Sequence, residues 1–112
     1  MLIIVAEIKG VAVLTPDIAN LDAGNVREFK DEALPRLTDA KKVVFDLSRI
    51  QFVDSSGLGA ILSALRKVNS NGGELKICGM TRTVHALFEL VRMHRVFDIH
   101  KERDDAIKAF GG

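Results

Sequence analysis

A buried-strand pattern that runs through a serine pair into a helix is the feature that most constrains the fold of this chain. Residues 42–47 read Lys-Val-Val-Phe-Asp-Leu, a β-branched run typical of a central strand. After Asp54-Ser55-Ser56-Gly57, apolar side chains recur over residues 58–68 at the spacing of a helix with one buried stripe. A strand followed by a helix favours an α/β fold, because parallel strands need crossover connections.

The first 40 residues predict a hairpin and a helix. Apolar runs at 2–8 and 11–14 are separated by Lys9-Gly10, and so short a turn joins only antiparallel strands. Asn25 and Glu28 then have the spacing of a capping box ahead of a helix. Because a proline disfavours helical geometry in the residue before it, Pro35 predicts an early end or a kink near Leu34. The inward positions of this helix are expected to be Val26, Phe29, Ala33 and Leu37.

The second half of the chain continues the alternation of strands and helices. Asn71-Gly72-Gly73 ends the central helix, and strands are expected at 74–78 and 97–100. Helices are expected at 81–93 and 102–110. The inward positions of the first of these are expected to be Val84, Leu87, Phe88 and Val91. The predicted fold is therefore α/β: a mixed, mostly parallel sheet opened by an antiparallel hairpin, with about four helices packed against it, in one domain over residues 1–112.

The charge balance and the cysteine content exclude several classes of protein. Sixteen basic and fifteen acidic residues give a formal net charge of +1, whereas a general nucleic-acid binder needs a clustered basic surface. Cys78 is the one cysteine, which excludes an internal disulfide and favours the reducing cytoplasm. Residues 1–8 lack the pattern of a signal peptide, and no window approaches the roughly 18 apolar residues of a membrane span. We expect a cytoplasmic protein that binds no nucleic acid and does not insert directly into a membrane.

The serine pair places a hydroxyl at the start of the central helix. The first amides of a helix lack internal acceptors, and the helix dipole favours negative charge there. A phosphate on Ser55 is therefore compatible with the fold while it changes the surface. Local chemistry alone leaves two interpretations open. Asp54, Ser55 and Ser56 can simply cap the helix, as such residues commonly do, or one serine caps while the other points outward as a phosphoacceptor.

Two glycines in the first turn of this helix need an explanation, because each costs about 1 kcal/mol relative to alanine. One explanation for Gly57 and Gly59 is backbone relief at a tight turn. The other is a platform without side chains on which another protein lies. Gly59, Ser63 and Arg66 recur at helical spacing opposite the apolar stripe. That face is either an interface or simply solvated.

Enzyme chemistry fits the chain poorly. Ser55 does not lie in a Gly-x-Ser-x-Gly elbow, and no histidine is placed to act as its base. His85, His94 and His100 are expected at the surface or partly buried. The glycine pair lacks the third glycine of a dinucleotide fingerprint, and no Lys-Ser/Thr pair of a phosphate-binding loop follows it. We therefore predict no enzyme activity, no metal and no cofactor.

The hexapeptide Asp54-Ser55-Ser56-Gly57-Leu58-Gly59, preceded by a strand that ends in Asp46-Leu47-Ser48, resembles the signature of STAS domains, specifically of the anti-sigma factor antagonists. The resemblance extends from about Leu2 to about Phe110. It implies that Ser55 accepts the phosphate and that Ser56 is a structural hydroxyl. Leu21-Asp22-Ala23 resembles the second landmark of the family, a leucine-aspartate pair whose loop lies near the phosphorylatable turn. The usual glycine upstream of that pair is missing here.

The resemblance implies a switch protein. The unphosphorylated form is expected to bind a serine-kinase anti-sigma factor that carries ATP or ADP, and so to release a sigma factor. The kinase then phosphorylates Ser55, and a serine phosphatase resets the protein. Two alternatives stay open: a STAS signalling module not linked to a sigma factor, and a STAS accessory subunit of a membrane lipid transporter. The expected partner-binding residues are Asp22, Asp54, Ser55, Ser56, Gly57, Gly59 and Ser63.

Overall fold

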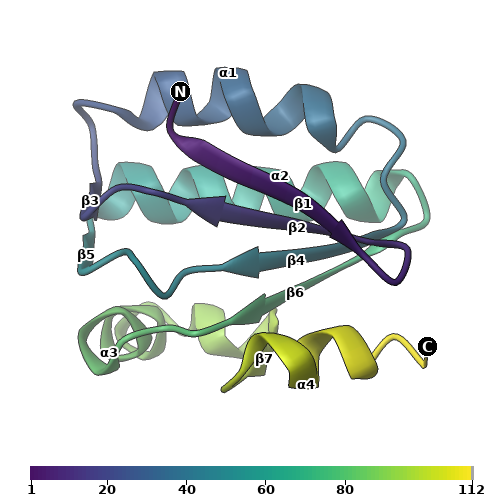
Figure 1. The fold of residues 1–112 in the computed structure, drawn as a ribbon. Coiled ribbons are helices and arrows are strands. Elements are labelled where there is room, and N and C mark those ends of the chain that lie inside the picture. The colour runs from purple at the N-terminus through teal and green to yellow at the C-terminus, as the bar shows by residue number, and fades with distance from the viewer. Residues whose placement is uncertain (112) are drawn as a thin grey trace.

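A computed structural model describes residues 1–111, so Gly112, the last residue of the expected domain, lies outside the described residues. Strands and helices alternate after an initial hairpin (Figure 1). The strands are β1 (Ile3–Ile8), β2 (Val11–Pro16), β3 (Asn20–Leu21), β4 (Lys42–Asp46), β5 (Phe52–Val53), β6 (Glu74–Cys78) and β7 (Asp98–His100). The helices are α1 (Val26–Arg36), α2 (Ser55–Ser70), α3 (Arg82–Leu90) and α4 (Arg103–Lys108), with a short 3-10 helix η1 (Met93–Arg95).

The main sheet confirms the predicted fold class. Its five strands lie in the order β1-β2-β4-β6-β7. β1 and β2 pair antiparallel, while β2·β4, β4·β6 and β6·β7 pair parallel. Lys9 and Gly10 form the hairpin turn, and both have positive φ, 53° and 79°. A two-residue turn of this kind matches the right-handed twist of the strands that it joins.

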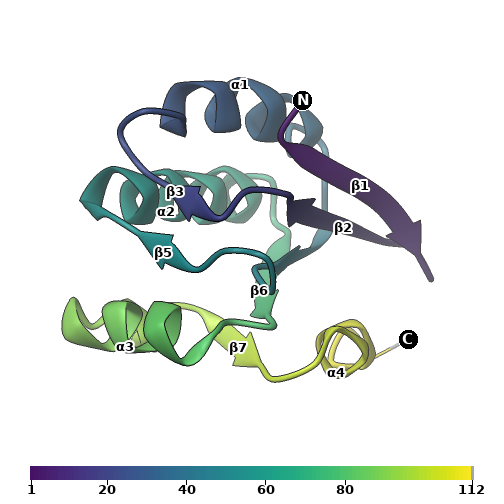
Figure 2. The same ribbon diagram turned by 60° about the vertical axis from the view of Figure 1, so that its left-hand side comes forward.

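Two hydrophobic clusters fill the space on either side of the sheet. The larger one packs α1, α2 and α3 on one face, with buried residues such as Phe29, Phe45, Ile61 and Phe88. The smaller one packs α4 on the opposite face through Ala106 and Ile107. Figure 2 shows α1 and α2 together on one side of the sheet and α4 on the other. The stripe predicted for α2 is confirmed, because Leu58, Ile61, Leu65 and Val68 are buried and Leu62 is partly buried.

A second, very small sheet was not predicted. β3 and β5 have two residues each and pair parallel, with Leu21 opposite Val53. The residues before them are also joined, since the Gln51 N–H donates to the Ala19 carbonyl at 2.6 Å. This pairing brings the loop before α1 against the turn before α2, and it thereby assembles the site described below.

The start and the end of α1 differ from prediction. The capping box is wrong: the Asn25 N–H donates to the Asp22 carbonyl, and the Asn25 side chain bonds Asp22 N at 3.0 Å and the Asn20 carbonyl at 2.7 Å. The helix does not end at Leu34 but continues to Arg36, with Pro35 inside its last turn; the alternative prediction of a kink stays a prediction. Pro35 is exposed, so water can solvate the carbonyl left without a partner. The expected inward residues Phe29 and Ala33 are buried.

The third predicted helix is shorter than expected. α3 ends at Leu90, and the left-handed Arg92, with φ 61°, redirects the chain into η1. Val84 and Phe88 are buried as predicted, but Val91 is 50% exposed, so its predicted inward position is wrong. The prediction failed because the helical spacing of apolar residues continues to Val91, although α3 ends at Leu90.

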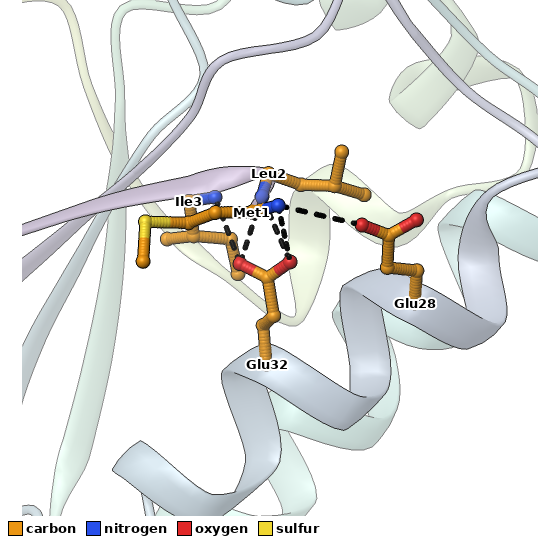
Figure 3. Close-up of polar contacts among 5 residues, drawn as sticks. All are labelled: Met1, Leu2, Ile3, Glu28 and Glu32. Atoms are coloured by element: carbon orange, nitrogen blue, oxygen red, sulfur yellow. Dashed lines mark hydrogen bonds and ion pairs between the residues drawn. The ribbon is translucent and has the colours of Figure 1, made fainter.

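The outer strand β1 is tied to α1 by a carboxylate (Figure 3). Glu32 accepts the N–H of Leu2 at 2.8 Å and that of Ile3 at 3.1 Å. The Met1 ammonium lies 3.7 Å from a carboxylate oxygen of both Glu28 and Glu32. The Glu28 side chain therefore faces the N-terminal strand instead of serving the expected capping box. No helix within residues 1–111 is long and apolar enough to cross a membrane.

Candidate functional site

Asp54 organises the turn that starts α2. It is the N-cap residue, with extended backbone angles, and its Oδ1 accepts the Gly57 N–H at 2.9 Å. Its Oδ2 accepts the Ala23 N–H at 3.0 Å. The carboxylate thus satisfies one free amide of the helix and, at the same time, one amide of the neighbouring loop. Both oxygens of Asp54 are engaged with the backbone, which fixes the position of the residues that follow.

Ser55 and Ser56 are the first two residues of α2, and both are exposed. Within residues 1–111 neither hydroxyl makes a hydrogen bond. The plain capping interpretation is confirmed for Asp54, which caps the helix, and the prediction that a serine does so is wrong. Ser56 therefore does not have the structural role expected for it, while the role of Ser55 as phosphoacceptor stays a prediction. A hydroxyl with no structural task at the positive end of a 16-residue helix is well placed for modification.

The loop that carries Asp22 lies against this turn, as the family resemblance implied. Asp54 N donates to the Leu21 carbonyl at 3.2 Å, and the Ala23 N–H reaches the Asp54 carboxylate. Asp22 is partly buried, and its Oδ1 accepts the Gly24 N–H at 2.9 Å. The structure therefore brings Asp22, Ala23, Asp54 and Ser55 together, even though the upstream glycine is missing.

The two glycines of the first turn have different surroundings. A Cβ on Gly57 would lie 2.4 Å from the Leu21 carbonyl oxygen and 2.6 Å from Val53 Cγ1. A Cβ on Gly59 would meet nothing within 4 Å. The platform interpretation thus suits the exposed Gly59, whereas the space over the buried Gly57 is filled by this chain's own β3 and β5.

The outer face of α2 continues from Gly59 to Ser63 and Arg66. The Ser63 hydroxyl donates to the Gly59 carbonyl at 3.0 Å, which is a bond back into its own helix. Arg66 is exposed one turn further on. This face has small side chains near the serines and a positive charge beyond them.

The electrostatics of the site depend on Asp54. The hydrogen bond from Gly57 N–H, and to a lesser degree that from Ala23 N–H, holds the pKa of the Asp54 carboxyl below its ordinary value of 3.8, although partial burial acts in the opposite direction. Asp54 is therefore ionised at neutral pH. Its negative charge lies directly before Ser55 in the chain, so any charge added to Ser55 meets it.

Sequence reasoning missed three contributors to this site. The Leu21 carbonyl and the Ala23 N–H are backbone groups, and side-chain patterns do not reveal them. Phe52, two residues before Asp54, is 45% exposed, and an exposed aromatic residue beside a functional turn is a candidate partner contact. Phe52 lies in a short segment without helical or strand periodicity, and its aromatic side chain there was the signal that the sequence offered.

Cys78 and the three histidines lie outside the Asp54 turn. Residues 1–111 contain no group of three or more His, Cys, Asp or Glu side chains placed to hold a metal ion. Cys78 is buried, and that burial raises the pKa of its thiol to about 12. His85, His94 and His100 are partly buried, as predicted.

Comparison with known proteins places this geometry in a family. Residues 3–106 match the family model of the STAS domain. The anti-sigma F factor antagonist of Paenibacillus polymyxa is 31% identical over 101 residues, which cover 88% of this chain and 86% of that protein. An anti-sigma-factor antagonist (STAS) domain protein from Planctomyces limnophilus has a TM-score of 0.90 at 18% identity, covering 98% of both chains. The Bacillus cell fate determinant SpoIIAA, in its phosphorylated form, has a TM-score of 0.71 at 16% identity, covering 96% of this chain and 98% of that one.

The two structural likenesses establish the fold, and the sequence match establishes the family. The match to the family model spans nearly the whole chain, including the hairpin, the Asp22 loop and the turn at Ser55. The chain therefore belongs to the STAS domain family, among relatives that are named anti-sigma factor antagonists.

Proposed function

We propose that this protein is an anti-sigma factor antagonist, a binding protein of the cytoplasm that is switched by phosphorylation of Ser55. In the unphosphorylated form it binds a serine-kinase anti-sigma factor that holds ATP or ADP, and the sigma factor held by that kinase is released. The relative in Paenibacillus polymyxa supports the proposal through its name. The phosphorylated state of SpoIIAA supports a phosphate-dependent mechanism on the same fold.

The observation that carries the proposal is the free Ser55 hydroxyl beside a fully occupied Asp54 carboxylate. Ser55 is exposed at the first position of α2, so another macromolecule can reach its oxygen. The two carboxylate oxygens of Asp54 accept hydrogen bonds from Gly57 N–H and Ala23 N–H. The turn is therefore held rigidly by one side chain while its neighbour is left available.

The proposed transfer step moves one phosphoryl group and one proton. The Ser55 oxygen attacks the γ-phosphorus of ATP, the bond from that phosphorus to the bridging oxygen of ADP breaks, and ADP leaves. The hydroxyl proton needs an acceptor. The backbone hydrogen bonds lower the pKa of Asp54 and so make it a weak base, which supports a kinase residue as the group that takes this proton.

The phosphate changes recognition without unfolding the domain. A phosphoserine adds a charge of about −2 next to the ionised Asp54, at a helix start that tolerates anions. Docking of the same kinase surface then buries an excess negative charge, which is costly unless it is paired. A shift from mostly bound to mostly free needs about 5.5 kcal/mol of differential affinity, and burial of an unpaired dianion is of that order. A serine phosphatase hydrolyses the phosphate ester with water and restores the binding form.

The docking surface extends from the Asp22 loop across the serines to the outer face of α2. Asp22, Asp54, Ser55, Ser56, Gly59 and Ser63 supply it, and all are exposed or partly buried. Gly57 supports the surface from beneath, where its missing side chain lets Leu21 approach α2.

Phosphorylation of defined variants by a candidate kinase tests the proposal. The wild-type protein is incubated with the kinase and ATP, and the intact mass and the modified residue are determined. We expect one phosphate on Ser55, none in Ser55→Ala, and wild-type modification in the matched control Ser56→Ala. A phosphate on Ser56, or an equal yield from Ser55→Ala, contradicts the assignment.

Binding of the same kinase tests the switch itself. With ADP present, Ser55→Asp is expected to bind at least about tenfold more weakly than wild type, because it places a charge beside Asp54. The control Ser70→Asp adds the same charge at the exposed far end of α2 and is expected to bind as wild type does. Equal binding by Ser55→Asp contradicts the switch. Co-purification with a transporter ATPase and no modification of Ser55 favours the accessory-subunit alternative.

A further inference from the structure

A cavity of about 380 Å³ opens at the carboxyl ends of β6 and β7. It is distinct from the Ser55 site, and none of the residues of the Asp54 turn lines it. Ligand sites in parallel sheets commonly lie at this position, beyond the ends of the strands. The volume lies in the range of small-molecule pockets, roughly 300–1,000 Å³. The cavity is lined by Met80, Arg82, His85, Ile99, His100 and Lys101.

The polar residues that line this cavity all have side chains that carry nitrogen. Arg82, His85, His100 and Lys101 are the polar residues of the lining, and no aspartate or glutamate is among them. Within residues 1–111, Arg82 and Lys101 form no ion pair. An uncompensated pair of cations at the mouth of a cavity is suited to an anion.

Carboxylates near the cavity are engaged outside it. The Glu89 carboxylate lies 3.5 Å from His85 Nδ1, and the Asp98 carboxylate lies 3.1 Å from His100 Nε2. Asp98 also pairs with Lys76 at 2.5 Å. The His100 Nε2 atom is buried and makes no well-aligned hydrogen bond, despite its distance from Asp98. Neither Glu89 nor Asp98 lines the cavity, so Arg82 and Lys101 remain its two lining cations without a carboxylate partner.

The cavity walls are held in place by the backbone. Gly79 N donates to the Lys101 carbonyl at 3.2 Å, which joins the loop after β6 to the loop after β7. Thr81 caps α3 by accepting the Val84 N–H at 3.2 Å. On the inner side, Met80 and Ile99 pack against the main hydrophobic cluster. The site therefore has a fixed frame, an apolar floor and a cationic rim.

We propose that this cavity binds a small organic anion with an apolar body. Arg82 and Lys101 hold the anionic head at the mouth, and Met80 and Ile99 contact the body. Charge-assisted bonds from an arginine and a lysine suit a phosphate or carboxylate head. The partly buried apolar floor favours a ligand that carries a ring or a short chain over a bare inorganic ion.

Phenyl phosphate is a suitable probe, because it combines an anionic head with a ring. It is titrated into the isotope-labelled protein at constant ionic strength, and the imidazole signals of His85 and His100 are followed by NMR. We expect saturable shifts at millimolar concentrations. The double variant R82A/K101A is expected to weaken binding at least about tenfold. Arg82 and Lys101 are exposed, so the variant retains the fold, and its amide spectrum verifies this.

Matched controls separate specific binding from general charge attraction. R27A/R66A removes two exposed arginines on α1 and α2 and so changes the net charge equally. This control is expected to bind phenyl phosphate as wild type does. Inorganic phosphate is expected to bind more weakly than phenyl phosphate, and neutral benzyl alcohol is expected not to saturate. The proposal is overturned if phenyl phosphate does not saturate or if both double variants weaken its binding equally. It is also overturned if inorganic phosphate or benzyl alcohol binds as well as phenyl phosphate does.

Discussion

Replacement of Gly57 by alanine measures how tightly the turn at Ser55 is packed. The new Cβ would lie 2.4 Å from the Leu21 carbonyl oxygen and 2.6 Å from Val53 Cγ1, both closer than real contacts allow. That carbonyl also accepts the Asp54 N–H at 3.2 Å, so a shift of Leu21 disturbs the joint between the two loops. Overpacking costs about 1–3 kcal/mol, and a clash with a backbone oxygen falls in the upper part of that range, about 2–3 kcal/mol, of which alanine returns about 1 kcal/mol through helix propensity. The expected result is a net loss of about 1–2 kcal/mol.

The same substitution two residues later provides the matched control. A Cβ on Gly59 meets nothing within 4 Å, so Gly59→Ala is expected to stabilise the protein by about 0.5–1 kcal/mol. Urea unfolding followed by circular dichroism measures both. With a slope of about 2 kcal/mol/M, the midpoint falls by about 0.5–1 M for Gly57→Ala and rises slightly for Gly59→Ala. If Gly57→Ala is as stable as wild type or more so, the close approach of Leu21 to α2 is refuted.

Three further predictions concern titration and reactivity. Folding lowers the pKa of Asp54, so its contribution to stability is complete above the ordinary value of 3.8 and is lost as the pH falls through the lowered value. Urea midpoints of wild type and Asp54→Asn, measured across that pH window, should show that wild type loses more stability. The hydrogen bond from Lys76 lowers the pKa of Asp98, so Lys76→Met should raise that pKa toward its ordinary value. An NMR titration of the carboxyl group measures this, and an unchanged pKa of Asp98 would contradict the pairing. Burial raises the pKa of the Cys78 thiol to about 12, so a thiol reagent at pH 8 should label Cys78 only after unfolding; rapid labelling of the native protein would contradict its burial.

The regular elements of this fold were predictable because their patterns extend over many residues. A two-residue turn between two apolar runs marks the hairpin, a short apolar run marks β6, and apolar residues at helical spacing mark α2. The start of α2 was also marked by local chemistry, since Asp54 and the serines are residues that favour helix starts.

The parts that escaped prediction depend on contacts between distant segments. β3 and β5 have two residues each, which is too few to show a period. Their pairing joins the segment before α1 to the segment before α2, which are far apart in the sequence. Asn25 and Glu28 have the spacing of a capping box, but Asn25 bonds to Asp22 and Asn20 while Glu28 faces Met1.

Within the site, the residues were predicted but not all of their tasks. Asp54, Ser55 and Asp22 do lie together, as the sequence indicated. Which residue caps α2 was not fixed by composition, because aspartate and serine both cap well. Asp54 is the cap because its carboxylate has two oxygens. One accepts the Gly57 N–H of the helix, and the other accepts the Ala23 N–H of the neighbouring loop.

The bond between Glu32 and the first amides of β1 bears on how this protein behaves at high concentration. An outermost strand offers unpaired backbone groups to the strands of other molecules, which is how fibrils grow. Here a carboxylate already occupies the Leu2 and Ile3 amides. An incoming strand would have to displace a charged group from good hydrogen bonds before it gained any of its own. Glu32 therefore makes the addition of a foreign strand less favourable at the start of β1.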